Sequence, residues 1–215
     1  MADAEPTTST QAAASVPAAG TPATSAPPPP VVTGETNTTP DSVKTGTTAR
    51  LGKPWVFSDK GIAFLGVQES GVLNGINFQK HKVTDGLILQ VYADGRGLPT
   101  VGLGHLVVAA DKLKLGDTVT LDQARAWVKN DVATAEKAVN SNVSVPLFQY
   151  EYDALVSLVF NCGIGHADEI AEFVNSGKYD KAPALIEPFR AAHGNGRRRK
   201  QEAAMFKDGN YDATH

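Results

Sequence analysis

The chain has 215 residues, a formal net charge of −3 and a single cysteine, Cys162. This length accommodates one domain or one domain plus a tail. A lone cysteine excludes an internal disulfide, and the slightly acidic balance argues against general nucleic-acid binding. No apolar stretch approaches the roughly 18 residues of a membrane span, so we expect no stable membrane insertion. No spacing typical of metal ligands or of a phosphate-binding loop occurs, so we expect no metal and no cofactor.

Composition divides the chain near residue 50. Residues 1–52 consist mainly of Ala, Thr, Ser and Pro, and the first aromatic residue is Trp55. Such a segment cannot bury enough apolar surface to offset its ordering entropy. We therefore predict a disordered tail over 1–52 and a folded domain over 53–215. The N-terminus lacks the basic and apolar regions of a secretory signal, so we expect synthesis in the cytoplasm without a signal peptide.

The first predicted helix covers residues 57–69, with Ser58 or Asp59 as its cap and Gly71 as its stop. Residues 70–86 are irregular, and we interpret them as a loop or as an extension of a sheet. Two apolar runs within 87–107 flank a glycine-rich turn, which predicts a β-hairpin. Asp94 and Thr100 stand at the two mouths of that turn.

The remainder of the chain is predicted to be helical. Thr120 caps a helix that keeps a 3.6-residue period to about Asn140. Residues 152–160 are apolar nearly all round, which indicates a buried central helix. Three shorter helical stretches are expected near 167–176, 178–191 and 196–207. One small sheet followed by helices predicts an α+β fold.

The spacing Tyr92-x-Asp94-x5-Thr100-Val-Gly-Leu-Gly-His105 resembles the motif of the phage-type lysozymes, a family of muramidases. Residues 154–163 resemble the central helix of that family, and Arg197-Arg198 with Glu202 resembles its closing segment. The resemblance implies a lysozyme-like fold, with a small β-hairpin lobe, a mostly helical lobe and a cleft between them. It also implies hydrolysis of the β-1,4 bond between N-acetylmuramic acid and N-acetylglucosamine in peptidoglycan.

The chemistry of that family requires an acid that protonates the glycosidic oxygen and a carboxylate that activates water. In the resemblance, Asp94 and Thr100 match the pair that positions the water. The acid has two candidates. Asp85 stands nine residues before Asp94, as the family spacing requires, but it is one methylene shorter than glutamate. Glu69 has the right residue type and ends the first predicted helix, but it requires an insertion of about sixteen residues. We favour Glu69 and keep Asp85 as the alternative.

Several other residues receive structural or weaker functional interpretations. Leu106 and Phe160 fall where the family lines its saccharide cleft, so the resemblance implies substrate contacts for them. His105 is expected to be structural, with a carboxylate partner, and Trp127 is expected to lie in the core. The basic run 197–200 is interpreted first as a solvated helix face.

The sequence thus favours a bacteriolytic peptidoglycan hydrolase that is a monomer and acts in the bacterial periplasm or cell wall. A non-catalytic peptidoglycan-binding module with the same fold, and a glycosidase of a related polymer such as chitin, remain alternatives. The delivery route is open among a phage endolysin, an enzyme carried on a virion and an antibacterial secreted effector. The last of these would bring an immunity protein and a secretion machine as partners.

Overall fold

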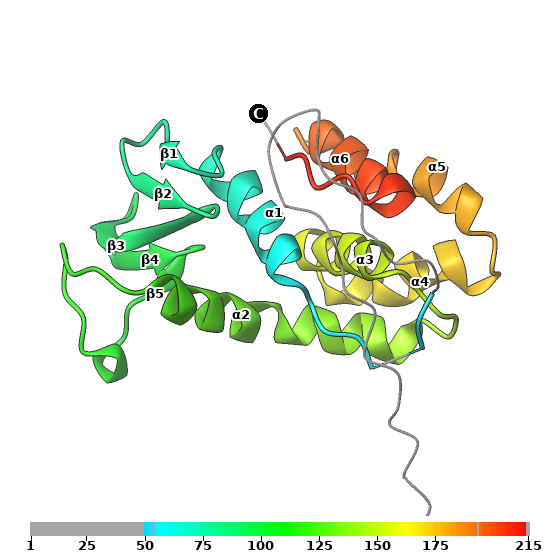
Figure 1. Ribbon diagram of the computed structural model, residues 1–215, viewed down its shortest axis with the longest axis horizontal. Coiled ribbons are helices and arrows are strands. Elements are labelled where there is room, and N and C mark those ends of the chain that lie inside the picture. The colour runs from blue at the N-terminus through cyan, green and yellow to red at the C-terminus, as the bar shows by residue number, and fades with distance from the viewer. Residues whose placement is uncertain (1–49, 53, 193, 214–215) are drawn as a thin grey trace, which may run out of the picture.

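The computed structural model describes residues 50–52, 54–192 and 194–213. The predicted tail over residues 1–49 lies outside these ranges. Figure 1 shows a small sheet at one end, a group of helices at the other, and the long helix α2 extending from one to the other. The helices are α1 (Asp59–Ser70), α2 (Leu121–Asn142), α3 (Gln149–Cys162), α4 (Ala167–Asn175), α5 (Ala182–Ile186) and α6 (Gly196–Asp208). The strands are β1 (Gly75–Ile76), β2 (Lys82–Thr84), β3 (Leu87–Ala93), β4 (Pro99–Gly102) and β5 (His105–Leu106).

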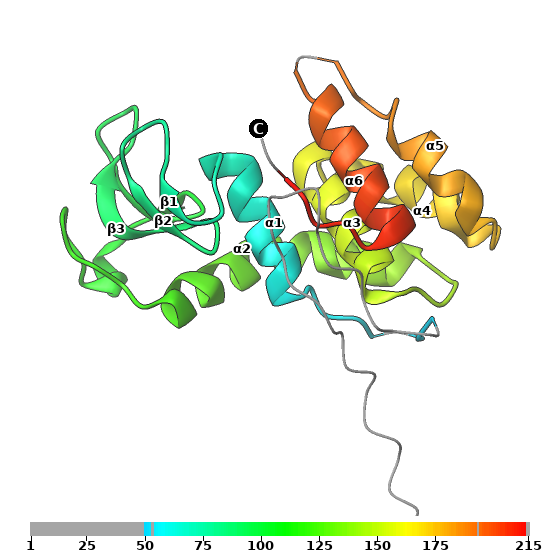
Figure 2. The ribbon, with the colours of Figure 1, turned by 45° about the horizontal axis from the view of Figure 1, so that its top comes forward.

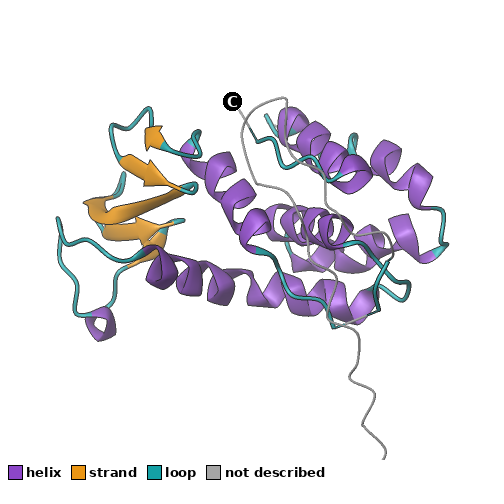
Figure 3. Cartoon of the chain, in the orientation of Figure 1, coloured by secondary structure: helices purple, strands orange, loops and turns teal. Residues whose placement is uncertain are grey.

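The described strands form one antiparallel sheet in the order β1-β2-β3-β4-β5. The predicted hairpin is confirmed as β3 and β4, in which Tyr92 pairs with Thr100. Residues 70–86 extend the sheet, because β1 pairs with β2 and β2 pairs with β3. Figure 3 shows these strands gathered at the end of the molecule away from most of the helices. The structure is therefore α+β, as predicted.

Helix α1 begins and ends as its sequence predicts. The Ser58 hydroxyl accepts a hydrogen bond from the Gly61 amide, which satisfies one of the free donors of the first turn. Gly71 has φ of 86° and donates its amide to the Val67 carbonyl. A left-handed residue with no Cβ ends the helix at low energetic cost. Glu69 consequently lies in the last turn, next to the sheet.

The core of the helical lobe is built around α3. Its side chains are buried on all faces, as its sequence predicts, and α2, α4 and α6 pack around it. In the turned view of Figure 2, these helices form one body beside the sheet, and α1 lies between the two. None of the helices in the described ranges is long and apolar enough to cross a membrane.

The prediction of one helix over 178–191 is wrong, because the helix observed there is much shorter. That segment contains a 3₁₀ turn (Tyr179–Lys181) and the short α5, and the helix ends before Pro188. Proline has no amide hydrogen and its ring clashes with the carbonyl four residues earlier, so the helix cannot continue normally through Pro188. Arg190 then adopts a left-handed conformation with φ of 49°.

Arg50 and Leu51, which the sequence assigns to the tail, contact the helical lobe. Leu51 forms an antiparallel bridge with Leu147. The Arg50 guanidinium lies 3.6 Å from the centre of the Tyr179 ring and donates to the buried carboxylate of Glu151 at 2.6 Å. The described chain therefore packs against the domain from Arg50 onward.

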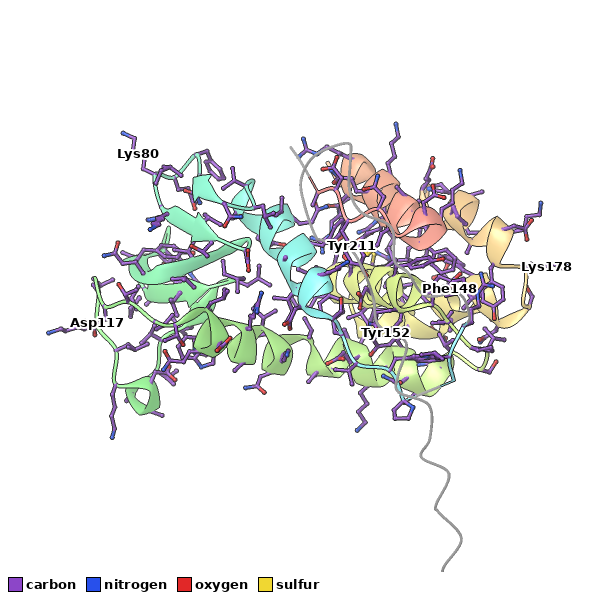
Figure 4. The ribbon with its side chains drawn as sticks, viewed as in Figure 1. Lys80, Asp117, Phe148, Tyr152, Lys178 and Tyr211 are labelled. Carbon is purple, nitrogen blue, oxygen red and sulfur yellow. The ribbon has the colours of Figure 1, made fainter. Side chains whose placement is uncertain are left out.

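The buried carboxylate of Asp153 joins three segments of the helical lobe. It accepts hydrogen bonds from the Ser58 backbone amide at 3.1 Å, the Gln149 side-chain amide at 2.9 Å and the Tyr211 hydroxyl at 2.6 Å, and also from the Ser58 hydroxyl. Tyr211 is labelled in Figure 4, in the helical half of the molecule. Burial nevertheless raises the pKa of Asp153 to about 6, because the bonds only partly offset the loss of water.

This raised pKa predicts a pH-dependent contribution to stability. In the unfolded chain an aspartate titrates at about 3.9, so the folded state holds more protons between about pH 4 and pH 6. The contribution is fully present below pH 4 and is lost as the pH rises through 6. We expect Asp153→Asn to have a lower free energy of unfolding than the wild type. This difference, measured in urea titrations, should become smaller as the pH rises from about 4 to about 6. Asp122→Asn, at an exposed position of α2, is the control. A deficit that stays constant with pH would contradict the raised pKa.

Helix α1 and the sheet approach each other closely at two glycines. A Cβ placed on Gly66 would lie 2.7 Å from the carbonyl carbon and oxygen of Gly86, where backbone cannot move aside easily. We expect Gly66→Ala to lower the free energy of unfolding by about 1–3 kcal/mol, as overpacked sites do. Gly165→Ala is the control, because a methyl group on Gly165 would meet no other part of the protein within 4 Å. Equal denaturation midpoints for the two variants would contradict the close contact between Gly66 and Gly86.

Candidate active site

A cavity of about 180 Å³ lies between the end of α1 and the sheet. The end of α1, the β1–β2 turn, β3 and the β4–β5 turn all contribute to its wall. Gly102 and Gly104, with φ of 69° and 94°, form the last of these turns without side chains that would fill the space. The residues around the cavity are Gly66, Glu69, Ser70, Gln79, Gly86, Ile88, Tyr92, Gly102, Leu103 and Gly104. Glu69 is the carboxylate among them.

Glu69 reaches the cavity from the last turn of α1. Its side chain is 51% exposed and is therefore accessible to a ligand. One carboxylate oxygen, Oε1, lies 3.2 Å from Nη1 of Arg198, which comes from the first turns of α6. This contact connects the cavity to the helical lobe.

A buried polar network lies behind Arg198. Its Nε donates to Oε1 of Glu202 at 3.1 Å, and the Ser157 hydroxyl donates to the same oxygen at 2.7 Å. Arg199, which is fully buried, binds the other oxygen of Glu202 and the side-chain oxygen of Asn161. The interpretation of 197–200 as a solvated face is therefore wrong for Arg198 and Arg199. They are buried because Glu202 and two polar residues of α3 supply their hydrogen-bond partners.

Asp94 lies at the end of β3, at the start of the hairpin turn. Its Oδ1 accepts hydrogen bonds from the backbone amides of Leu98 and Arg96, both at 2.8 Å. The bond from the Leu98 amide is the main reason that the pKa of Asp94 lies below its ordinary value. Hydrogen bonds to the charged form of this carboxylate favour that form over the protonated one.

Thr100 lies opposite, on β4, and is buried. Its hydroxyl donates to the Leu98 carbonyl at 3.1 Å, so Leu98 contacts both Asp94 and Thr100 through its backbone. The structure thus places the two residues in one hairpin, as the sequence indicates. Neither of them is among the residues around the 180 Å³ cavity.

Asp85 occupies the turn between β2 and β3, with φ of 48°. Its Oδ2 accepts a hydrogen bond from Nη2 of Arg125, on α2, at 3.0 Å. Its neighbour Gly86 borders the cavity, but Asp85 itself does not. The carboxylate of Asp85 therefore forms an ion pair with a residue of α2.

The carboxylate partner expected for His105 is present. Its Nε2 lies 3.3 Å from Oδ2 of Asp111, and its ring stacks on Trp127 with 4.5 Å between centres. Trp127 is partly buried and packs against the core. Leu106 is exposed and Phe160 is partly buried, and both lie outside the cavity wall, so their substrate contacts stay predictions.

Two residues at this site were not assigned a role from the sequence. Gln79 belongs to the irregular stretch 70–86, which carries no periodic signal. Arg198 stands four residues before Glu202, a spacing that places both on one face of a helix and could have indicated the pair. Within the described ranges, no group of three or more His, Cys, Asp or Glu side chains could hold a metal ion.

The family model described as Phage lysozyme matches residues 82–202, more than half of the chain. The chain belongs to the phage lysozyme family. The endolysin of Acyrthosiphon pisum secondary endosymbiont phage 1 is 34% identical over 134 residues, which cover 57% of this chain and 89% of that endolysin. The endolysin of Salmonella phage P22 is 42% identical over 91 residues, 42% of this chain and 61% of that protein.

Solved lysozyme structures share the fold. An endolysin from Escherichia coli O157:H7 phage FAHEc1 superposes with a TM-score of 0.55 at 26% identity, covering 75% of this chain and 99% of that one. A point mutant of P22 lysozyme gives a TM-score of 0.55 at 29% identity, covering 71% and 99%. Together with the family, these proteins support peptidoglycan hydrolysis as the general activity. The family match begins in β2, so it includes Asp85 and Asp94 but not Glu69.

The buried network predicts a large effect on the stability of this lysozyme. Glu202→Gln keeps the shape of the side chain but removes the negative charge that compensates Arg198 and Arg199. Because breaking a buried ion pair leaves a cation uncompensated, we expect a loss of about 3–5 kcal/mol in unfolding free energy, measured by urea denaturation. Glu169→Gln, at an exposed pair with His166, should change it by less than about 1 kcal/mol. Similar losses in both variants would contradict the role of Glu202.

Proposed function

We propose that the chain is a muramidase, which cleaves the β-1,4 bond between N-acetylmuramic acid and N-acetylglucosamine in the bacterial cell wall. The observation that carries the proposal is the accessible carboxylate of Glu69 in a cavity beside the hairpin that holds Asp94 and Thr100. A pair of carboxylates in different environments is what acid-assisted glycoside hydrolysis requires. No cofactor enters this chemistry.

In the proposed mechanism, Glu69 protonates the glycosidic oxygen as the leaving group departs. Asp94, held in place by hydrogen bonds from the Leu98 and Arg96 amides, activates the attacking water. Thr100 helps to position that water from the opposite strand. The positive charge that develops on the sugar ring is stabilised by the negative charge of Asp94. Arg198 acts on Glu69 as a positioning residue.

Two features support Glu69 over Asp85 as the acid. The first is that the Asp85 carboxylate is bound to Arg125 outside the cavity, whereas Glu69 borders the cavity. The second is the path of the intervening chain. The Gly86 amide donates to the Leu73 carbonyl at 2.8 Å, so residues 74–85 leave α1 and return to the same place. The additional residues between Glu69 and Asp94 therefore form a loop whose two ends lie together beside α1.

The test measures reducing ends released from purified peptidoglycan by Glu69→Gln, Asp94→Asn and Asp85→Asn. We expect the first two to lose activity by about 10²- to 10⁴-fold, the usual contribution of an acid or base. Asp85→Asn should keep most of it, because asparagine also tolerates a left-handed backbone. Identifying the new end as N-acetylmuramic acid by mass spectrometry defines the bond.

Thermal unfolding of each variant separates loss of activity from loss of fold. Full activity of Glu69→Gln with loss in Asp85→Asn would overturn the assignment of the acid. If the wild-type chain sediments with peptidoglycan but releases no reducing ends, the protein is a binding module and not an enzyme.

A further inference from the structure

The β1–β2 hairpin, residues 75–84, presents basic and apolar side chains to solvent. Lys80 and Lys82 are exposed, and no acidic residue occurs between Ser70 and Thr84 in a chain whose net charge is −3. Phe78 is 80% exposed and Ile76 is 63% exposed. Figure 4 shows Lys80 projecting from the tip of this hairpin, away from the body of the molecule. An exposed apolar patch that is bordered by polar or charged side chains is typical of an interaction site.

The hairpin is held in a defined position. The Asn77 amide donates to the His81 carbonyl at 3.0 Å, and the His81 amide donates to Oδ1 of Asn77 at 2.8 Å. The His81 ring packs on Tyr92 with 4.3 Å between ring centres. Because Tyr92 lies on β3, two residues before Asp94, the hairpin is fixed to the strand that leads to the proposed base.

The hairpin is also continuous with the cavity. Gln79 belongs to its tip and borders the cavity together with Tyr92 and Glu69. Lys80 follows Gln79 directly in the chain. A polymer seated at Glu69 would therefore extend toward side chains of the hairpin, where the charge is positive.

We propose that the β1–β2 hairpin binds the acidic stem peptide of peptidoglycan, a deepening that rests on the proposed function. Lys80 and Lys82 attract the carboxylates of the peptide, and Phe78 with Ile76 packs against its apolar side chains. The muramic-acid units of peptidoglycan carry such peptides, each with several carboxylates, whereas a unit without its peptide keeps only the single carboxylate of its lactyl group. The hairpin thus selects glycan strands that bear peptides.

The test compares intact peptidoglycan with glycan strands from which an amidase has removed the peptides. We expect Lys80→Gln/Lys82→Gln to raise KM for intact peptidoglycan about three- to tenfold, since each exposed ion pair contributes modestly. The ratio of the variant's KM to that of the wild type should fall toward one on stripped strands, which keep only the lactyl carboxylates. Higher salt should reduce the preference of the wild type for intact material.

The matched control is Lys112→Gln/Lys114→Gln. These exposed lysines lie in the loop after β5, and Lys112 has φ of 54°, close to the 65° of Lys80. Each double variant therefore removes two positive charges and changes one residue with a left-handed backbone. Only the hairpin variant should change KM.

Three results would overturn the inference. The first is an unchanged KM in the hairpin variant, and the second is an equal increase in KM on intact and stripped substrates. The third is that binding to intact peptidoglycan is inhibited by a phosphate polymer such as teichoic acid but not by free stem peptide. A wild type that releases no reducing ends from either substrate refutes the proposed function instead. In that case, co-sedimentation with intact and stripped peptidoglycan tests the hairpin alone, and equal binding of both by the wild type would refute it.

Discussion

The Arg198 guanidinium connects the buried centre of the helical lobe to the cavity carboxylate. Its side chain is 9% exposed, and it contacts Glu202, Ser157 and Glu69. A buried cation requires compensating charge and hydrogen-bond partners to offset its loss of water. Arg198 and Arg199 carry two positive charges, which Glu202 and Glu69 balance. The position of Glu69 is therefore set by the packing of α3 against α6, and not only by the helix on which it lies.

Helix α1 is restrained at both ends, and the two restraints have different physical origins. At its start, the buried carboxylate of Asp153 holds the Ser58 amide and hydroxyl, so hydrogen bonding fixes that end to α3. Near its other end, Gly66 lies against the backbone of Gly86, so steric fit fixes it to the sheet. A shift of about 1 Å in the last turn would displace the carboxylate proposed as the acid, and a misplacement of that size can lower a catalytic rate by on the order of 10²-fold. These restraints explain how a half-exposed glutamate keeps one place relative to the strands.

Elements with local signals could be predicted from the sequence. Ser58 and Gly71 mark the ends of α1, and the apolar runs around the glycine turn mark β3 and β4. Strands β1 and β2, of two and three residues, are too short to show a period. The burial of Arg198 and Arg199 depends on Ser157 and Asn161, which are 41 and 38 residues away in the chain. A basic run carries no local sign of such partners, so its burial became visible only in three dimensions.

The position of the proposed acid could not be predicted from local sequence signals either. Motif spacing measures distance along the chain, and by that measure Asp85 fits the family and Glu69 does not. The bond between Gly86 and Leu73 closes residues 74–85 into an excursion that starts and ends beside α1. An insertion of this kind changes the numbering between two residues without moving either one. It can also add a surface at the edge of the cavity, because its ends are fixed beside the cavity and its tip is free to carry new side chains.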